Sequence, residues 1–307
     1  MSERSHYVGI DWGSTNARAL LFTPDDRLVE EREEPLGIKR VPAGGLPAAF
    51  AAFTSAWRER HGPIPVLLSG MIGSRQGWHE APYLSCPVIL TELHRSLVPV
   101  PGVTAATIVP GLSFTCAARS DVMRGEELQL LGLGERAAAF DWVCIPGTHS
   151  KWVRAEWPVV REFHTAMTGE MFAAIAEHTL FANLISPQGA AAGSFAAAAF
   201  EQGLDRSAAP HGVLNTLFGI RADVLLGRIA TDEIRDLISG LLIGTEIRHI
   251  LGQAPAKSRV AVLAARELQT RYLRALTFFN LAATAFAVSQ ITADGFVALM
   301  RRRRAGA

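Results

Sequence analysis

Apolar and polar positions alternate along the first part of the chain in a way that predicts strands joined by tight turns. The pattern predicts strands at residues 7–11, 17–23 and 27–34, separated by the turn-forming stretches DWGSTN and TPDD, which is typical of an antiparallel meander. A helix is expected at 46–60, and a strand over 64–70 leads into the glycine-rich loop GMIGSRQGWHEAPY. Irregular loops that follow strands often carry functional residues, so this loop is a candidate site.

The middle of the chain repeats the order of strand, glycine-hydroxyl turn and strand. A helical pattern over 121–139 precedes a predicted strand at 142–146, the turn GTHSKW and a second strand over 151–157. Alanine- and leucine-rich helices are expected after it, at 169–181, 194–202 and 232–251. The pattern predicts two α/β halves, hinged between about Leu133 and Asp141.

Glycines mark two further features. Gly240 and Gly244 lie four residues apart on one helical face, where small residues permit close packing. The stretch GLGERA at 132–137 has the spacing of a dinucleotide-binding motif, but it follows an apparent helix instead of a strand, so we interpret it as a helix end and hinge. A Walker lysine motif is missing from the sequence, which excludes a P-loop kinase.

Composition and charge predict a soluble, cytoplasmic protein without nucleic-acid or membrane partners. Thirty basic residues balance 29 acidic ones among 307, and 49% of the chain is hydrophobic, which is enough for two domains. The one basic run, Arg301 to Arg304, is interpreted as a frayed, solvated tail. Its three cysteines are odd in number and lack C-x-x-C spacing, which argues against a disulfide framework or a zinc site. We expect no signal peptide, and the longest apolar stretch, about 276–288, is too short to span a bilayer.

The first strand-connecting turn, DWGST, has the groups that bind a phosphate chain and its Mg²⁺. Such a site needs backbone N–H donors, small residues, hydroxyls and a carboxylate that holds the metal through water. Asp11 would face the metal, Gly13 would permit the turn, and Ser14 and Thr15 would donate hydrogen bonds. Taken alone, such a turn is more often plain turn chemistry than a phosphate site.

The second turn, PGTHSK, has a similar set. Gly147, Thr148 and Ser150 would form another phosphate cradle, with Lys151 nearby. Two such turns, each between strands and one in each half, favour a nucleotide clamp over ordinary turns.

Six segments, taken in order, resemble the signature segments of one enzyme family. They are IDWGSTNARA, GMIGSRQGWHEAPYLSCP, VMRGEELQLLG, PGTHSKWV, FHTAMTGEMF and SGLLIGTEI, from about residue 6 to residue 251. The family is that of the 2-dehydro-3-deoxygalactonokinases, in the sugar kinase, heat-shock ATPase and actin superfamily. The resemblance implies an α/β chain of two ribonuclease-H-like (actin-like ATPase) domains, with ATP and a sugar acid in an interdomain cleft.

The same resemblance implies ATP- and Mg²⁺-dependent phosphorylation of the terminal (6-) hydroxyl of 2-dehydro-3-deoxy-D-galactonate, a step of D-galactonate catabolism. Residues 1–138 would bind the sugar acid and phosphates, and residues 139–307 the nucleotide. The implied partners are small molecules. A homodimer fits, but the sequence leaves open both the oligomeric state and the choice between the galacto and gluco epimers.

The catalytic base is assigned by position. In related carbohydrate kinases the acid of a GDQ motif accepts the hydroxyl proton, and here RGEELQ occupies its place. Glu126 is then the match and Glu127 the alternative. Both also fit a plain role as carboxylates in the first turn of a helix, favoured by the helix dipole.

Substrate contacts follow from the resemblance and from carboxylate chemistry. A guanidinium binds a carboxylate through two parallel hydrogen bonds, and the candidates are Arg124, beside the base, and Arg40, which fits a surface charge equally well. In the glycine-rich loop, Gly73 and Ser74 would contact the sugar acid, and Trp78 would form an apolar wall or belong to the core.

Beyond residue 252 the resemblance fades. Ala264 and Ala265 stand where the family has a glycine pair beside the adenosine, and their methyl groups predict weaker ATP binding. Three alternatives remain: another sugar or sugar-acid kinase, a phosphohydrolase of the same superfamily, and a non-catalytic nucleotide or sugar sensor.

Overall fold

The computed structural model describes residues 5–185, 195–252 and 258–306. The chain forms two compact units. Unit 1 comprises Met1–Ala138, Arg154–Phe163 and Val288–Ala307, and unit 2 comprises Ala139–Val153 and His164–Ala287. The first passage between them, after Ala138, lies inside the expected hinge. The division at residue 138 into two continuous domains stays a prediction, and the units differ from it in that two later segments belong to unit 1.

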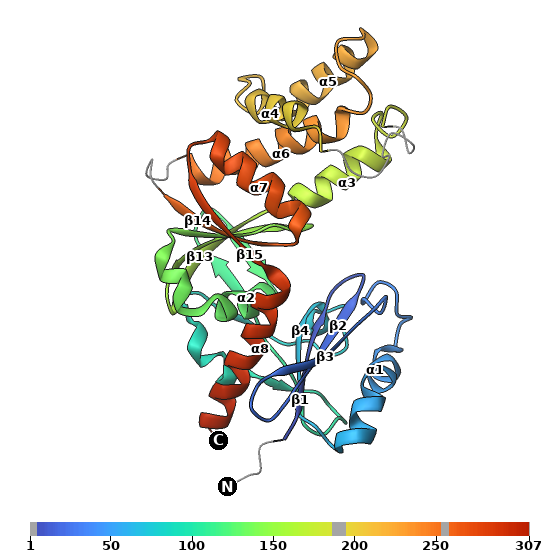
Figure 1. The fold of residues 1–307 in the computed structure, drawn as a ribbon, viewed down its shortest axis with the longest axis vertical. Coiled ribbons are helices and arrows are strands. Elements are labelled where there is room, and N and C mark those ends of the chain that lie inside the picture. Colours follow the sequence, from blue (N-terminus) through green and yellow to red (C-terminus); the bar gives the residue numbers. More distant parts are fainter. Residues whose placement is uncertain (1–4, 186–194, 253–257, 307) are drawn as a thin grey trace. The chain divides into compact units, whose positions relative to one another are not determined.

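Unit 1 is built on a mixed sheet of order β3-β2-β1-β4-β8-β7 (Figure 1). The predicted meander is confirmed, because β1 and β3 both pair with β2 in antiparallel fashion, while β4 and β8 continue the sheet in parallel. The strands are β1 (Tyr7–Trp12), β2 (Ala17–Phe22), β3 (Leu28–Glu34), β4 (Val66–Gly70), β7 (Val98–Pro99) and β8 (Ala106–Ile108), and α1 (Leu46–His61) connects β3 to β4.

Unit 2 contains most of a second sheet with the same order of strands. From the central strand outwards, β12 and β13 lie on one side of β11, and β14 and β15 lie parallel to it on the other. The strands are β11 (Trp142–Ile145), β12 (Ser150–Glu156), β13 (Val159–Ala166), β14 (Arg259–Ala264) and β15 (Ala282–Ala287). The start of β13, which belongs to unit 1, pairs with β6 (Val88–Ile89). Repetition of one strand order is what two related α/β domains would show.

The helices of unit 2 are α3 (Thr168–His178), α4 (Ala197–Arg206), α5 (Gly212–Leu225), α6 (Ile234–Leu251) and α7 (Arg266–Phe278). The predicted close packing at Gly240 and Gly244 is confirmed, since α4 lies against α6 (Figure 1). A Cβ at Gly240 would stand 2.0 Å from the Phe200 carbonyl oxygen, and one at Gly244 would stand 2.6 Å from Ser207 Oγ. Only glycine permits this approach.

The remaining elements of unit 1 surround its main sheet. They are the short sheet of β5 (Tyr83–Ser85), β9 (Gly111–Thr115) and β10 (Ser120–Met123), the 3₁₀ turns η1 (Met71–Gly73), η2 (Leu90–Ser96) and η3 (Gly134–Ala139), and the helices α2 (Glu126–Leu133) and α8 (Val288–Ala305). A hydrophobic core with Trp12 and Trp57 fully buried supports this unit, and hydrophobic clusters around Phe200 and Ile238 support unit 2. Within the described ranges, no helix is both long and apolar enough to cross a membrane.

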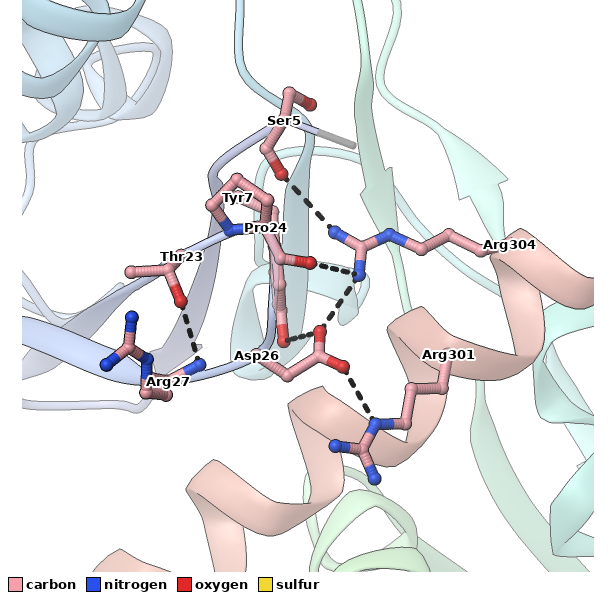
Figure 2. A network of polar contacts seen from close by, with 8 residues as sticks. All are labelled: Ser5, Tyr7, Thr23, Pro24, Asp26, Arg27, Arg301 and Arg304. Carbon is pink, nitrogen blue, oxygen red and sulfur yellow. Dashed lines mark hydrogen bonds and ion pairs between the residues drawn. The ribbon is translucent and has the colours of Figure 1, made fainter. Parts of the chain in front are cut away.

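Two expectations from the sequence are wrong. The helix expected over 121–139 is interrupted, because Ser120–Met123 pairs with β9 as a strand and Gly125 adopts a left-handed φ of 106° before α2 begins. The run Arg301–Arg304 is not a frayed tail but lies in the last turns of α8. There, Arg301 and Arg304 bind Asp26, as Figure 2 shows. Ion pairs with a residue far away in the sequence therefore hold this segment in place.

All three cysteines are free thiols in the structure: Cys86 is half-buried, Cys116 exposed and Cys144 buried. Burial raises the pKa of the Cys86 thiol to about 11, which keeps it protonated and unreactive at neutral pH.

Candidate active site

The first phosphate-type turn joins β1 to β2 and is held by its backbone. The Gly13 N–H donates to the Asn16 carbonyl at 2.9 Å, and the segment after β3 closes over the turn through the Gly37 N–H, which donates to the Thr15 carbonyl at 2.9 Å. Ser14 is half-buried and Thr15 is exposed. The turn thus has a fixed backbone with its hydroxyl-bearing residues at the surface.

Asp11 lies one residue before the end of β1, opposite Ser69 of β4 in the parallel register. Gly70 follows with φ 87°, and a Cβ there would stand 3.1 Å from Asp11 Oδ1. On its other side, Gly70 approaches Gly125, whose added Cβ would lie 3.4 Å from the Gly70 Cα. Gly70 therefore brings the carboxylate of β1 close to the start of α2.

The environment of Asp11 disfavours its charge. Desolvation raises the pKa of this carboxyl to about 6, with a smaller raise from Glu33, while Arg18 opposes the shift. A raised carboxyl pKa at the end of a strand, beside glycine backbone, is typical of a functional site.

Glu126 and Glu127 stand side by side in the first turn of α2 and fold back on the preceding backbone. The Arg124 N–H donates to Glu126 Oε2 at 2.9 Å, and the Gly125 N–H donates to Glu127 Oε2 at 2.7 Å. Both are thus first-turn helix carboxylates, as the plain interpretation expected. Their surroundings differ, because Glu126 is half-buried and Glu127 is fully buried. Desolvation, with a further contribution from the Glu126 charge, raises the pKa of Glu127 to about 8.

Arg124 is 9% exposed and lies against the glycine-rich loop. Its Nη2 donates to the Ala81 carbonyl at 2.7 Å, and its guanidinium stacks 4.4 Å from the Tyr83 ring centre. A Cβ at Gly73 would stand 2.8 Å from Arg124 Nη1, so glycine makes room for the guanidinium. Among the described residues, Nε and Nη1 have no hydrogen-bond partner. A buried cation with unused donors fits an anionic ligand.

The other predicted substrate residues are more dispersed. Ser74 Oγ donates to the Met71 carbonyl at 2.7 Å, and so caps the 3₁₀ turn that holds Gly73. Trp78 is half-buried and packs against Phe50 and the core of unit 1, in line with its interpretation as a core residue. Arg40 is exposed in the segment after β3, and within the described part of the chain no hydrogen bond or ring contact joins it to Arg124.

The second turn, between β11 and β12, packs on the start of α3. The Glu170 N–H donates to the Thr148 carbonyl at 2.9 Å, and a Cβ at Gly169 would stand 2.3 Å from the Gly147 carbonyl oxygen. Gly147 and Thr148 lie at the surface. Gly169, the glycine of TGEM, thus lets the N-terminus of α3 pack against this turn. The sequence motifs, taken one at a time, did not predict this contact.

Ser150 and Lys151, both predicted at the phosphates, are buried behind this turn. Ser150 Oγ shares a hydrogen bond of 2.8 Å with the Tyr272 hydroxyl, and Lys151 Nζ donates to Thr165 Oγ1 at 2.8 Å. In this structure their side chains bind protein groups, and Gly147 and Thr148 form the exposed part of the turn.

A pocket of about 140 Å³ lies in unit 2 beside the second turn. Its wall is formed by the turn and by α3, α6 and α7. The residues that line it are Gly147, Thr168, Gly169, Phe172, Arg235, Ser239, Leu242, Ile243, Glu267, Leu268, Arg271 and Tyr272. Sequence reasoning singled out Gly147 alone among these residues. The others lie in the segments FHTAMTGEMF, SGLLIGTEI and ELQTRYL or close beside them. The sequence therefore pointed to these segments, but not to the individual residues that line the pocket.

Ala264 and Ala265 lie at the end of β14 and at the start of α7, close in sequence to the pocket residues Glu267 and Leu268. Ala265 has φ −69° and ψ 156°, an extended conformation that any residue adopts. The backbone here does not require glycine. The expected weakening of ATP binding by the two methyl groups stays a prediction.

The residues described also bear on metal binding. Among them, no group of three or more His, Cys, Asp or Glu side chains is placed to hold a metal ion. A single carboxylate, that of Asp11, could hold Mg²⁺ through the ion's water ligands. Mg²⁺ is often bound in this way beside phosphates.

The model of the 2-keto-3-deoxy-galactonokinase family matches residues 11–299. The chain belongs to this family. It is 35% identical over 283 residues to the 2-dehydro-3-deoxygalactonokinase of Escherichia coli (strain K12), covering 92% of this chain and 93% of that protein. It is 36% identical over 281 residues to a probable 2-dehydro-3-deoxygalactonokinase of Rhizobium meliloti (strain 1021), covering 90% of each.

Solved structures agree with the family assignment. A protein from Sinorhizobium meliloti assigned as a 2-dehydro-3-deoxygalactonokinase has a TM-score of 0.87 at 34% identity, over 97% of this chain and 98% of that one. The activator of 2-hydroxyisocaproyl-CoA dehydratase from Clostridium difficile, solved with bound ADPNP, has a TM-score of 0.52 at 11% identity, over 98% of this chain and 96% of that one. This chain therefore has a two-domain α/β fold of the actin-like ATPase type, as expected.

Proposed function

We propose that this chain transfers the γ-phosphoryl group of ATP to the terminal (6-) hydroxyl of 2-dehydro-3-deoxy-D-galactonate, in D-galactonate catabolism. The observation that carries the proposal is the match of one kinase family over residues 11–299, joined by two curated relatives that bear this activity in their names. The chain is accordingly a kinase. The roles of its residues, the metal and the assembly are argued below.

The nucleotide is proposed to bind unit 2, with its phosphates at Gly147 and Thr148 and its base and ribose in the adjoining pocket. The position of the turn on the N-terminus of α3 supports this, because the first backbone N–H groups of a helix favour anions. The pocket volume, about 140 Å³, is below the range of about 300–1,000 Å³ usual for small-molecule sites. It would enclose part of the nucleotide and leave the rest exposed.

Unit 1 is proposed to bind the sugar acid and the metal. Asp11 would hold hydrated Mg²⁺, and the turn of Gly13, Ser14 and Thr15 would donate hydrogen bonds to a phosphate. When bound, the ion would neutralise charge on the transferring phosphoryl group. Phosphoryl transfer requires that ATP and the sugar acid come into contact during turnover.

Glu126 is proposed as the base in preference to Glu127. A general base must be unprotonated and within reach of the proton that it accepts. Glu127 is fully buried, and with a pKa of about 8 it is mostly neutral at pH 7. Glu126 is half-buried on the same helical turn. This difference supports Glu126 as the group that accepts the proton of the sugar hydroxyl, and Glu127 as a neutral, structural group.

Arg124 is proposed to bind the carboxylate of the sugar acid. It is held by Ala81 and Tyr83 beside Gly73, whereas Arg40 lies exposed. A substrate that lacked the carboxylate would leave this guanidinium buried without its anion, which is costly, so Arg124 would select acids over neutral sugars.

A coupled assay with ATP, Mg²⁺ and the two epimeric 2-keto-3-deoxy acids tests the proposal. We expect turnover with the galacto epimer, a drop in kcat of about 10²–10⁴-fold for Glu126→Gln, and retained ADP binding. Glu135→Gln, an exposed carboxylate beyond the same helix, is the control and should match the wild type. Fast ATP hydrolysis without any sugar acid would point instead to a phosphohydrolase, and binding without turnover to a sensor.

A cytoplasmic location is also proposed, because the metabolic role and the free cysteines fit a reducing compartment. The proposed assembly is a homodimer. Sedimentation of the purified chain decides the assembly, and a monomer at micromolar concentration would exclude the dimer.

A further inference from the structure

A buried carboxylate lies behind the nucleotide pocket of unit 2. Glu246 of α6 is 5% exposed. Trp152 Nε1 donates to its Oε1 at 2.6 Å, the Tyr272 hydroxyl lies 3.0 Å from both oxygens, and Thr168 Oγ1 donates to Oε2. One carboxylate thus joins β12, α3 and α7 to α6.

Two of these partners reach the proposed nucleotide site. Thr168 and Tyr272 both line the pocket. Thr168 is the first residue of α3, and the next residue, Gly169, packs against the Gly147 carbonyl. The Tyr272 hydroxyl also bonds Ser150, at the start of β12 and two residues beyond Thr148. Glu246 is therefore connected to both ends of the phosphate turn and to the opposite pocket wall.

The geometry suits a carboxylate in particular. Trp152, Thr168 and Tyr272 all donate, so the group between them must accept several hydrogen bonds. A glutamine would set its NH₂ group against one or both hydroxyls, which would then have to accept instead of donate, so the directions of these hydrogen bonds would change. Burial raises the pKa of Glu246, and the hydrogen bonds from Thr168, Trp152, Tyr272 and Ser150 act against that rise.

We propose that Glu246 is a positioning residue for the nucleotide: it fixes the start of α3 and the Tyr272 side chain so that the turn of Gly147 and Thr148 and the pocket share one arrangement. The proposal rests on the proposed binding of ATP in unit 2. Preorganised donors of this kind speed phosphoryl transfer because they need no rearrangement at the moment of reaction. Glu246 does not line the pocket, so its effect must pass through Thr168 and Tyr272.

The test compares Glu246→Gln with two matched variants. Thr245→Ala changes the neighbouring residue of α6, whose hydroxyl bonds only the Leu241 carbonyl of its own helix. Trp152→Phe removes a donor to the same carboxylate from a fully buried side chain that does not line the pocket. ADP affinity is measured by titration calorimetry without sugar acid, alongside KM for each substrate, kcat and the melting temperature.

For Glu246→Gln we expect ADP affinity and kcat to fall about tenfold or more, while KM for the sugar acid stays within about twofold of the wild type. Thr245→Ala should match the wild type. Trp152→Phe should lower the melting temperature with ADP affinity kept within about threefold. If Glu246→Gln does not fold, Thr168→Val repeats the test by removing one hydrogen bond to the carboxylate, with the same expected loss of ADP affinity.

Wild-type ADP affinity in the folded Glu246→Gln or Thr168→Val variant would overturn the positioning role, and so would losses in every variant that simply follow the melting temperature. A wild-type chain that fails to bind ADP at all would instead contradict the proposed nucleotide site, so the two failures are distinguishable.

Discussion

Two adjacent glutamates show how strongly the position of a single residue decides its chemistry. Glu126 and Glu127 carry the same group on the same helical turn, yet one is half-buried and the other fully buried. The sequence placed Glu126 first by position and kept Glu127 as the alternative, but it could not show how the two differ in burial, which is set by the packing of α2 against other elements. In the structure this difference favours Glu126 as the base.

Titration of Glu127 should make stability depend on pH. Its pKa rises from 4.5 to about 8 on folding, so the folded state binds the proton more tightly. This contribution to stability is complete below about pH 4.5 and is lost as the pH rises towards 8. Glu127→Gln, which resembles the neutral acid, should therefore exceed the wild type in free energy of unfolding by about 2 kcal/mol or more at pH 8.5, and by little at pH 5.

Urea unfolding at several pH values measures this difference. Glu135→Gln, an exposed change in the following turn, should show the same pH profile as the wild type. A Glu127→Gln curve that stays parallel to the wild type from pH 5 to 8.5 would mean that Glu127 titrates normally.

At the scale of elements, close backbone contacts with α8 hold α2, the helix that carries the proposed base, in place. α2 crosses α8 where two glycines face the other helix. A Cβ at Gly132 would stand 2.0 Å from the Ile291 carbonyl oxygen, and one at Gly295 would stand 2.3 Å from the Leu128 carbonyl oxygen. Because α2 begins with Glu126, any shift at this crossing also moves the proposed base.

Gly295→Ala should therefore destabilise the protein although alanine favours helices. Helix propensity alone would add about 1 kcal/mol, but a methyl group forced against backbone costs on the order of 1–3 kcal/mol or more. We expect a net loss of about 2 kcal/mol in the free energy of unfolding, together with a lower kcat.

Gly219→Ala is the matched control, since nothing lies within 4 Å of a Cβ at this helical position in α5. It should raise stability by about 0.5–1 kcal/mol. Equal effects of the two substitutions would argue that α2 and α8 are not packed this closely.

Some helices and strands could be predicted from the sequence pattern, and others could not. Six strands, β1, β2, β3, β4, β11 and β12, were predicted to within two residues, because alternation and turn residues are local properties. The other strands of the two sheets, among them β8, β13, β14 and β15, were not predicted. α5 was not predicted, although Val213, Leu217, Ile220 and Val224 recur at helical spacing and pack inward. Its exposed apolar side chains Leu214, Phe218 and Leu225 obscure that pattern in the sequence. The interruption of the helix at 121–139 depends on pairing with β9, which no local period reveals.

At the scale of the whole molecule, the two ends of the described chain meet in unit 1. Arg301 and Arg304 of α8 bind the 8%-exposed carboxylate of Asp26 at 2.8 and 2.9 Å, and the Tyr7 hydroxyl donates to the same group at 3.0 Å (Figure 2). Arg304 Nη2 also donates to the Ser5 carbonyl. This cluster ties the last helix to the first strand.

Asp26→Asn should release that tie without disturbing the turn, because asparagine tolerates the left-handed φ of 68° at this position. Charged hydrogen bonds contribute about 1.5–3 kcal/mol each, so we expect the free energy of unfolding to fall by about 2 kcal/mol. Differential scanning calorimetry measures the loss.

The neighbouring Asp25→Asn breaks an exposed pair with Arg27, whose side chains are 60% and 76% exposed. Surface pairs contribute about 0–1 kcal/mol, so this control should change little. Similar losses in both variants would show that the Asp26 cluster does not anchor α8.

The sequence by itself determined the N-terminal meander, the strands on either side of the two glycine-hydroxyl turns and the family, since each depends on residues that are neighbours in the chain. Only the tertiary structure decided that residues 154–163 and 288–307 belong to unit 1, that Glu127 is buried while Glu126 is not, and that Glu246 joins α3, α7 and β12. Those features arise from contacts between residues far apart in sequence, and burial in such contacts sets pKa values and hydrogen-bond partners that no local pattern records.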